Sequence, residues 1–244
     1  MKTSLRALAF AIALVPFTRA HAISFIYDPG ILHETSAFAS FNTTGAEMAG
    51  MGVHVEYVDG STHDATLQLL SAGNGRVNDS SLFLQIGNTG TTAFAWLIGN
   101  SASVAMRSIS FDGQPGNTVF DVSFPFGEFA GFSFVGTPGT STGRELELSS
   151  LYGIYDGLTV TYSDAVALTG AAAVGDVFRR MTIDFSTGRM LASGGAIEFR
   201  QDTDSLAFGS VLAPASVSEH GATLVLLCGG LMALVMCRRL TVSQ

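Results

Sequence analysis

The central part of this 244-residue chain lacks both cysteine and lysine. Cys228 and Cys237 lie in an apolar C-terminal tail, and the only lysine is Lys2. The absence of cysteine from the central part excludes disulfide bonds and thiol catalysis there. Residues 23–213 contain seven arginines and 19 acidic residues, a net charge of −12. Such a charge disfavours nucleic acid and anionic lipid as partners and suits cations and neutral polysaccharide.

Most motifs of common catalytic classes are also absent. The sequence has no His-Glu-x-x-His metal site, no P-loop and no dinucleotide-binding glycine motif. The stretch 139–143, Gly-Thr-Ser-Thr-Gly, has the Gly-x-Ser-x-Gly spacing of a nucleophile elbow, but we interpret it as a loop. A carboxylate pair for glycoside hydrolysis can always be chosen from 19 acids, but nothing singles one out. We therefore expect a non-catalytic protein, with a glycan-active hydrolase as a remote alternative.

The N-terminus has the pattern of a secretory signal peptide. Lys2 and Arg6 precede a nine-residue apolar stretch, Ala7–Val15, which is too short to span a bilayer. Ala20 and Ala22 supply the small residues before a signal peptidase site. We expect residues 1–22 to be removed after export through the Sec machinery, so that the mature chain starts at Ile23.

The C-terminus has the pattern of a short membrane helix with a basic end. The 17 residues from Gly221 to Cys237 carry no charge, and Arg238 and Arg239 follow directly. A helix of this length reaches about 25 Å, near the lower limit for crossing a bilayer. The arginines favour the cytoplasmic side. We expect a linker and motif at residues 214–220 and a helix with its basic end at residues 221–239.

This tail resembles the PEP-CTERM class of bacterial sorting signals, which exosortases recognise and cleave. The motif position is taken by Val217, Ser218, Glu219, His220 and Gly221, similar to the Val-Pro-Asp-Ser-Gly variant, and Arg238 and Arg239 form the basic cluster. The resemblance implies an exosortase partner, transient anchoring in the inner membrane, and delivery to the surface or matrix of a Gram-negative cell. Stretches such as Met48–Val55 and Gln201–Ser205 are similar to recurring phrases of domains that precede such tails and have no assigned chemistry.

The central part reads as an all-β domain. Short runs rich in Val, Ile, Phe, Thr and Tyr recur between turn signals, and no helical pattern extends past two turns apart from an ambiguous stretch at Val166–Val174. Typical runs are Val53–Val58, Val104–Phe111, Thr118–Phe124, Val177–Phe185 and Leu206–Val211. We expect one β-sandwich or jelly roll over residues 23–213. Its core should include Val53, Val55, Leu67, Leu69, Phe94, Trp96, Ile183 and Phe185.

One predicted hairpin joins Val53–Val58 to the following strand. A two-residue turn would pair Val55 with Asp64 and bury a carboxylate, so we predict a three-residue loop at 59–61 that pairs Val53 with Leu67 and Val55 with Ala65. This register places Glu56 opposite Asp64. Opposed like charges are unfavourable unless they splay into water or share a cation.

Two groups of residues are candidate ligand sites. Asp202 and Asp204 alternate along the chain, so their carboxylates point the same way and can share Ca²⁺, although a solvated acidic loop is the plainer interpretation. Phe94 and Trp96 share one strand face, where they either stack on sugar or pack in the core.

These features suggest an exported surface or matrix protein with a structural or adhesive role. A carbohydrate-binding module, with calcium at the aspartates, is the alternative, and exopolysaccharide is then the expected partner.

Overall fold

The structure is a computed structural model of the chain, and it describes residues 23–28, 30–40, 43–71, 73–88, 95–122, 143–149, 157–169, 176–207 and 213–214. The expected signal peptide and the expected sorting helix lie outside these residues. Within the described part, no helix is both long enough and apolar enough to cross a membrane.

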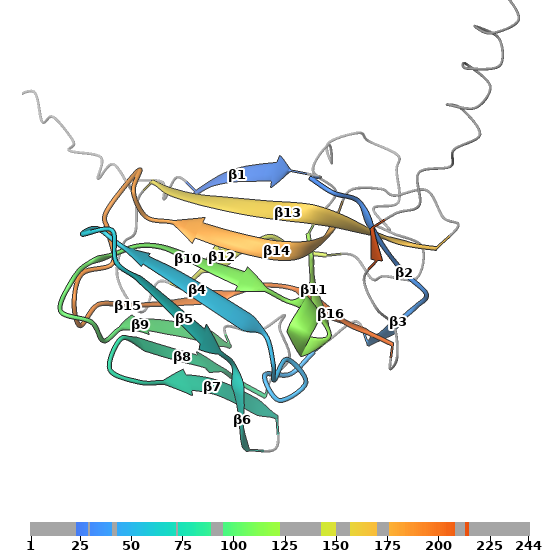
Figure 1. Ribbon diagram of the computed structural model, residues 1–244, viewed down its shortest axis with the longest axis horizontal. Helices are drawn as coiled ribbons and strands as arrows, with labels where there is room; N and C mark the ends of the chain where they lie inside the picture. The colour runs from blue at the N-terminus through green and yellow to red at the C-terminus, as the bar shows by residue number, and fades with distance from the viewer. Residues whose placement is uncertain are drawn as a thin grey trace, which may run out of the picture.

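The described strands form two sheets, as the sequence predicted for an all-β domain (Figure 1). The larger sheet has eleven strands: β1 (Ile23–Asp28), β2 (His33–Thr35), β3 (Phe38–Ser40), β4 (Gly52–Tyr57), β5 (Thr62–Thr66), β10 (Met106–Asp112), β11 (Thr118–Asp121), β13 (Leu158–Leu168), β14 (Val177–Asp184), β16 (Thr203–Leu206) and β17 (Ala213–Pro214). The smaller sheet has six: β6 (Gln68–Ser71), β7 (Asn74–Asn78), β8 (Leu82–Ile86), β9 (Trp96–Asn100), β12 (Glu147–Leu148) and β15 (Ala196–Arg200).

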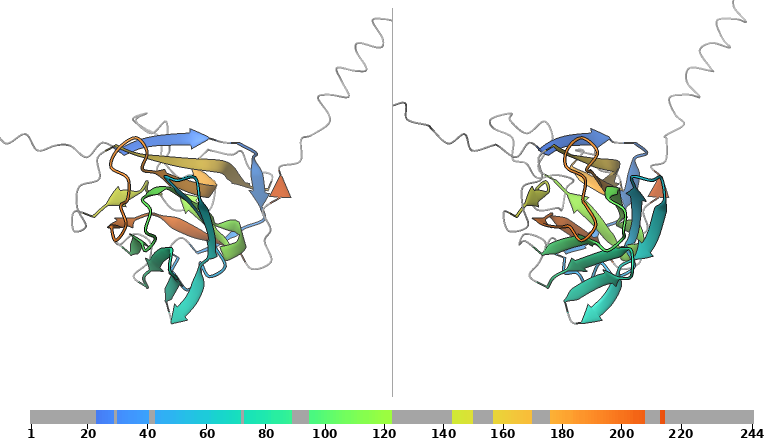
Figure 2. Two further views of the ribbon diagram at one scale, coloured as in Figure 1. Left: turned by 60° about the vertical axis from the view of Figure 1, so that its left-hand side comes forward. Right: turned by 90° about the vertical axis from the view of Figure 1, so that its left-hand side faces the viewer.

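The two sheets lie one above the other, consistent with a β-sandwich. In every view of Figures 1 and 2, the teal strands β7 and β8 lie on the opposite side of the molecule from the blue β1 and the gold β13. Almost all neighbouring strands run antiparallel, and the described exceptions are β1 and β2, which pair with β13 in parallel. A 3₁₀ turn, η1 (Gln114–Gly116), joins β10 to β11.

Aromatic rings fill the space between the sheets. Trp96 of β9 is fully buried and meets Phe111 of the larger sheet edge-on at a centroid distance of 5.5 Å. It also stacks on Phe199 of β15, with centroids 5.5 Å apart, and contacts Phe120 of β11 at 6.4 Å. Because one indole contacts strands of both sheets, it lies at the centre of the core.

Most of the predicted core residues are confirmed. Six of them are buried in one cluster: Val53, Val55, Leu67, Trp96, Ile183 and Phe185. Leu69 is a wrong prediction, because its position in the short β6 leaves it 63% exposed. Phe94 lies outside the described residues.

The predicted register of the β4–β5 hairpin is wrong by two residues. Val53 pairs with Ala65 and Val55 with His63, and the loop is formed by residues 58–60 between Tyr57 and Ser61. A shift by two preserves the faces, so Val53 and Val55 still point into the core. It also removes the predicted pairing of Glu56 with Asp64, since Asp64 lies opposite His54.

Two strand boundaries also differ from the prediction. The run predicted at Leu206–Val211 begins three residues earlier, because β16 spans Thr203–Leu206. The ambiguous pattern at Val166–Val174 starts in an extended segment, since β13 continues to Leu168.

The core predicts a large cost for truncating the indole. Trp96→Ala should lower the free energy of unfolding by about 3–5 kcal/mol, because it leaves a cavity between the sheets. Leu69→Ala is the matched control and should change it by less than about 0.5 kcal/mol, because that side chain is exposed. Urea denaturation of the purified protein measures both values. Equal losses in the two variants would contradict the assignment of Trp96 to the core.

Candidate functional site

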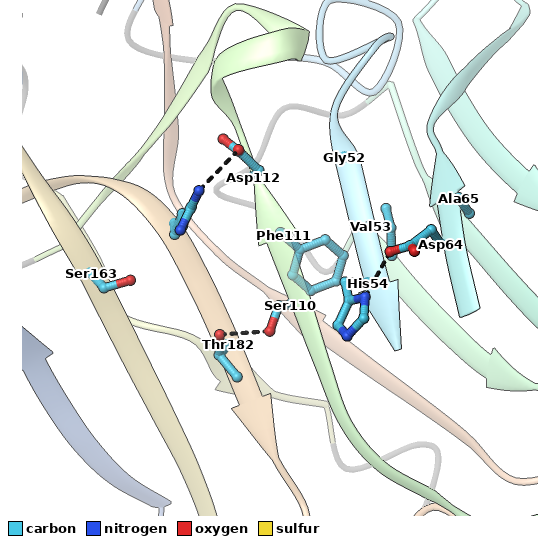
Figure 3. Close-up of a pocket in the computed structure, with 11 residues that line it drawn as sticks. Gly52, Val53, His54, Asp64, Ala65, Ser110, Phe111, Asp112, Ser163 and Thr182 are labelled. Atoms are coloured by element: carbon cyan, nitrogen blue, oxygen red, sulfur yellow. Dashed lines mark hydrogen bonds and ion pairs between the residues drawn. The ribbon is translucent and has the colours of Figure 1, made fainter. Parts of the chain in front are cut away.

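A polar cleft of about 430 Å³ lies on the outer face of the larger sheet (Figure 3). Its polar side chains come from five strands and alternate with core residues such as Val53 and Phe111, so they project away from the core. They are His54, Asp64, Ser110, Asp112, Ser163, Arg180 and Thr182. Described residues of the cleft thus offer hydroxyl, carboxylate, imidazole and guanidinium groups within one concave surface.

A row of directly paired residues crosses this cleft. Asp64, His54, Ser110, Thr182 and Thr161 lie opposite one another on successive strands from β5 to β13. The Asp64 carboxylate lies 2.6 Å from Nδ1 of His54, and the hydroxyls of Ser110 and Thr182 lie 2.8 Å apart. The cross-strand register therefore creates a strip of hydrogen-bonding groups, and Figure 3 shows both contacts.

An ion-pair network closes one end of the cleft. Arg179 donates two hydrogen bonds to Asp112, of 3.0 and 2.7 Å, while Arg180 lies 3.6 Å from Asp112 and 3.6 Å from Asp164. Burial raises the pKa of Asp112, but the hydrogen bonds and charge of Arg179, with smaller effects of Gln114 and Arg180, hold it below its usual value. Asp112 is therefore an ionised carboxylate at neutral pH.

The row brings a serine, a histidine and an aspartate onto adjacent strands, but the arrangement differs from that of a nucleophilic triad. The Ser110 hydroxyl pairs with Thr182, and no hydrogen bond joins it to His54 in the described part of the chain. The His54–Asp64 pair is also exposed, with 44% and 81% of the two side chains accessible. This geometry suits hydrogen bonding to a polyhydroxylated ligand better than activation of a nucleophile.

A second group of polar residues is buried at the other end of the sheet. Asp202 and Asp204 are 3% and 0% exposed, so they do not form the solvated loop that we considered. Asp121 of β11 and Asp176, just before β14, are also buried. In the β11–β16 ladder Val119 lies opposite Asp204, and the Asp121 N–H donates to the Asp202 carbonyl. The side chains of Asp121, Asp202 and Asp204 therefore share one face.

Burial and the charges of neighbouring acids raise the pKa of Asp121 and of Asp204. Burial, and then the charges of Asp204, Asp176, Asp202 and Glu145, raises the pKa of Asp121 to about 10. Burial together with the charges of Asp202 and Asp176 raises the pKa of Asp204 to about 8. Neither oxygen of Asp121 or Asp204 has a hydrogen-bond partner. Among the described residues, no three or more His, Cys, Asp or Glu side chains converge closely enough to hold a metal ion as they stand.

The sites predicted from sequence have different outcomes. Trp96 cannot stack on a sugar, because it is fully buried and packs in the core. Phe94 and the sorting residues Val217, Ser218, Glu219, His220, Gly221, Arg238 and Arg239 lie outside the described residues. Asp202 and Asp204 are brought together as predicted, although calcium there stays a prediction.

Neither Asp121 nor the polar cleft was predicted from the sequence. Asp121 stands within the apolar run Thr118–Phe124, and an acidic residue in such a run is the signal that could have identified it. The residues that line the cleft look like ordinary surface residues in the sequence, and only the order of the strands in the sheet brings them together.

Comparison of the chain with protein-family models, with curated proteins and with solved structures gave no match.

The raised pKa values predict an unusual pH dependence in metal-free buffer. A carboxyl whose pKa in the folded state lies above the ordinary 3.8 binds more protons when the protein is folded. Its stabilising contribution is fully present below about pH 3.8, and it is lost as the pH rises to about 8 for Asp204 and about 10 for Asp121. The free energy of unfolding should therefore fall between pH 5 and 9, by more than about 1.4 kcal/mol.

Chemical denaturation in metal-free buffer at several pH values tests this expectation. Asp204→Asn should flatten the slope, because the asparagine cannot ionise. Asp59→Asn is the control, since Asp59 is an exposed turn residue whose carboxylate oxygen accepts from Ser61, a bond that an amide oxygen can replace. A slope that is the same in all three proteins would contradict the assignment to the buried acids.

Proposed function

We propose that this is an exported, non-catalytic protein of the cell surface or extracellular matrix, sorted by an exosortase-type signal and acting in a structural or adhesive role. The observation that carries this proposal is the tail, in which Val217–Gly221 precedes an uncharged stretch and two arginines. The acidic, cysteine-free central part is consistent with it. Jelly-roll connectivity of the domain stays a prediction.

Sorting predicts proteolysis of the tail. In the native host, mass spectrometry of surface material should find C-terminal peptides that end within Val217–Gly221 and none that cover Leu231–Arg239. Loss of the host's exosortase should leave the full tail in the membrane fraction. Recovery of peptides from Leu231–Arg239 in the mature surface form would contradict cleavage and indicate a permanent anchor.

A second candidate function is glycan binding through the polar cleft. The observation that favours it is the strip of hydroxyl, imidazole and carboxylate groups across β5, β4, β10 and β14, which matches the donors and acceptors of a neutral polysaccharide. The central part's charge of −12 favours a neutral over an anionic polymer. Because Trp96 is buried, it cannot serve as an aromatic platform for sugar, and we therefore assign glycan binding to the cleft.

The two histidines of the β4–β5 hairpin provide a matched test. His54 lines the cleft, whereas His63 lies outside it and contacts Asp79 at 2.9 Å. His54→Ala should weaken binding to the host's purified exopolysaccharide about fivefold to tenfold, the loss of roughly one hydrogen bond, while His63→Ala should not. Isothermal titration calorimetry measures the dissociation constants.

The same experiment separates the alternatives. Equal affinity of both variants would remove the cleft as the binding surface. Release of reducing ends that is lost in Ser110→Ala would replace the binding proposal with a glycan-active hydrolase.

A further inference from the structure

The polar cleft contains a second row of directly paired residues. Its members lie opposite one another on β4, β10, β14 and β13, and all of them line the cleft: Gly52, Asp112, Arg180 and Ser163. The row that contains His54 lies two residues away along each of these strands, so both rows project from the same face of the sheet. A ligand in the cleft therefore meets two parallel rows of side chains.

Arg180 has unused hydrogen-bond donors in this row. In the part of the chain that the structure describes, its guanidinium makes no hydrogen bond, and its contacts are ion pairs of 3.6 Å with Asp112 and Asp164. Arg179, by contrast, donates two hydrogen bonds to Asp112. A guanidinium carries five N–H groups in a planar fork, and 49% of the Arg180 side chain is exposed. Arg180 can therefore donate to a ligand from solution.

The charges around Arg180 balance, which favours a neutral ligand. Arg179 and Arg180 pair with the carboxylates of Asp112 and Asp164. An anion bound to Arg180 would be repelled by both carboxylates. A hydroxyl group both accepts and donates, so a pair of hydroxyls can accept from Arg180 and donate to Asp112, which is ionised at neutral pH.

Gly52 leaves part of the cleft floor without a side chain, although alanine would fit there. A Cβ at this position would have Cβ of Asp112 as its nearest described atom, at 3.6 Å, and the φ angle of Gly52 lies outside the left-handed region. A Cβ on Gly75 of β7, by contrast, would lie 2.3 Å from the carbonyl oxygen of Gly45. Glycine weakens a strand and often marks a place where a ligand approaches the backbone closely. Gly52 thus indicates a ligand independently of Arg180.

We propose that one sugar ring of a neutral glycan lies over Gly52, and that Arg180 donates to two adjacent hydroxyls of this ring while Asp112 accepts from one of them. The planar fork of a guanidinium suits two neighbouring oxygens, which a lysine cannot engage in the same way. Ser110 and His54 in the other row bind the remainder of the ring. The inference rests on the glycan binding proposed for the cleft and adds the class of sugar, one with an unsubstituted vicinal diol.

Periodate treatment of the glycan tests the diol directly. Periodate cleaves the carbon–carbon bond between adjacent hydroxyl-bearing carbons, and borohydride then reduces the aldehydes, so the polymer stays neutral. The probe is the host's purified exopolysaccharide, native or treated, titrated calorimetrically with the full-length protein. Treated polymer should bind the wild type about tenfold more weakly than native polymer does. It should bind Arg180→Gln and the wild type equally, because the diol that Arg180 recognises is gone.

A pair of glycine variants tests the floor of the cleft. Gly52→Ala should weaken binding of native polymer about tenfold or more, because its methyl group occupies the space of the ring. Gly99→Ala is the matched control, since Gly99 lies in β9 of the other sheet and a Cβ there would lie 3.5 Å from Cβ of Phe83. Its affinity should equal that of the wild type. Both variants should unfold at urea concentrations no lower than the wild type, because alanine favours a strand more than glycine does.

Arginine variants separate the fork from the charge. Arg180→Gln and Arg180→Lys should both weaken binding of native polymer about tenfold. Arg107→Gln should not, because Arg107 is an exposed arginine of β10 outside the cleft. The affinity of the wild type should change less than about twofold between about 0.05 and 0.5 M sodium chloride, as expected for a neutral ligand.

The outcomes distinguish the diol from glycan binding itself. If native polymer does not bind the wild type, glycan binding in the cleft fails and the diol inference fails with it. If native polymer binds and His54→Ala weakens it, but periodate treatment and Gly52→Ala have no effect, the cleft keeps its function and only the diol inference is overturned. Full affinity of Arg180→Lys would also overturn it, because a charge would then suffice.

Discussion

The packing of Trp96 between the sheets is the contact on which the rest of the described structure depends. Its ring touches Phe199 in its own sheet and Phe111 and Phe120 in the other. With no cysteine in residues 23–213, burial of such apolar surface is the main force that holds the sheets together. Phe111 and Phe120 belong to β10 and β11, the same strands that carry Ser110 and Asp121. The core contact therefore positions both the cleft and the buried carboxyl groups of Asp121 and Asp204.

Side chains alternate strictly between the two faces of these strands, so the packing of one face into the core also sets which residues lie on the opposite face. Because Phe111 points inward, Ser110 and Asp112 point outward into the cleft. Because Phe120 points inward, Val119 and Asp121 point to the other face of the same sheet. The two sites differ in what covers them: the His54–Asp64 pair is exposed, whereas Asp121 and Asp204 are inaccessible. A ligand from solution can therefore reach the first site directly, whereas the protein itself surrounds the second.

The sequence predicted the fold class and most of the core because both rest on local signals. Short β-rich runs and alternating apolar residues such as Val53 and Val55 indicate strands whatever their partners are. The β4–β5 register failed because two hairpins, offset by two residues, bury the same face and differ only in which polar residues are opposed. The observed register pairs Asp64 with His54 at 2.6 Å, an interaction that pattern reasoning with Glu56 did not consider.

The sites were less predictable than the fold, for a topological reason. Asp202 and Asp204 were visible as a pair because two residues on one strand share a face. Asp121 is about eighty residues away in sequence, and only the pairing of β11 with β16 brings it to them. The same holds for the cleft, whose row of hydroxyls is assembled from strands far apart in the chain. In a sheet of eleven strands, a polar residue within an apolar run can indicate a site even when its partners lie far away in the sequence. Asp121 in the run Thr-Val-Phe-Asp-Val is such a residue, since a carboxylate at a buried strand position needs either a proton or a cation.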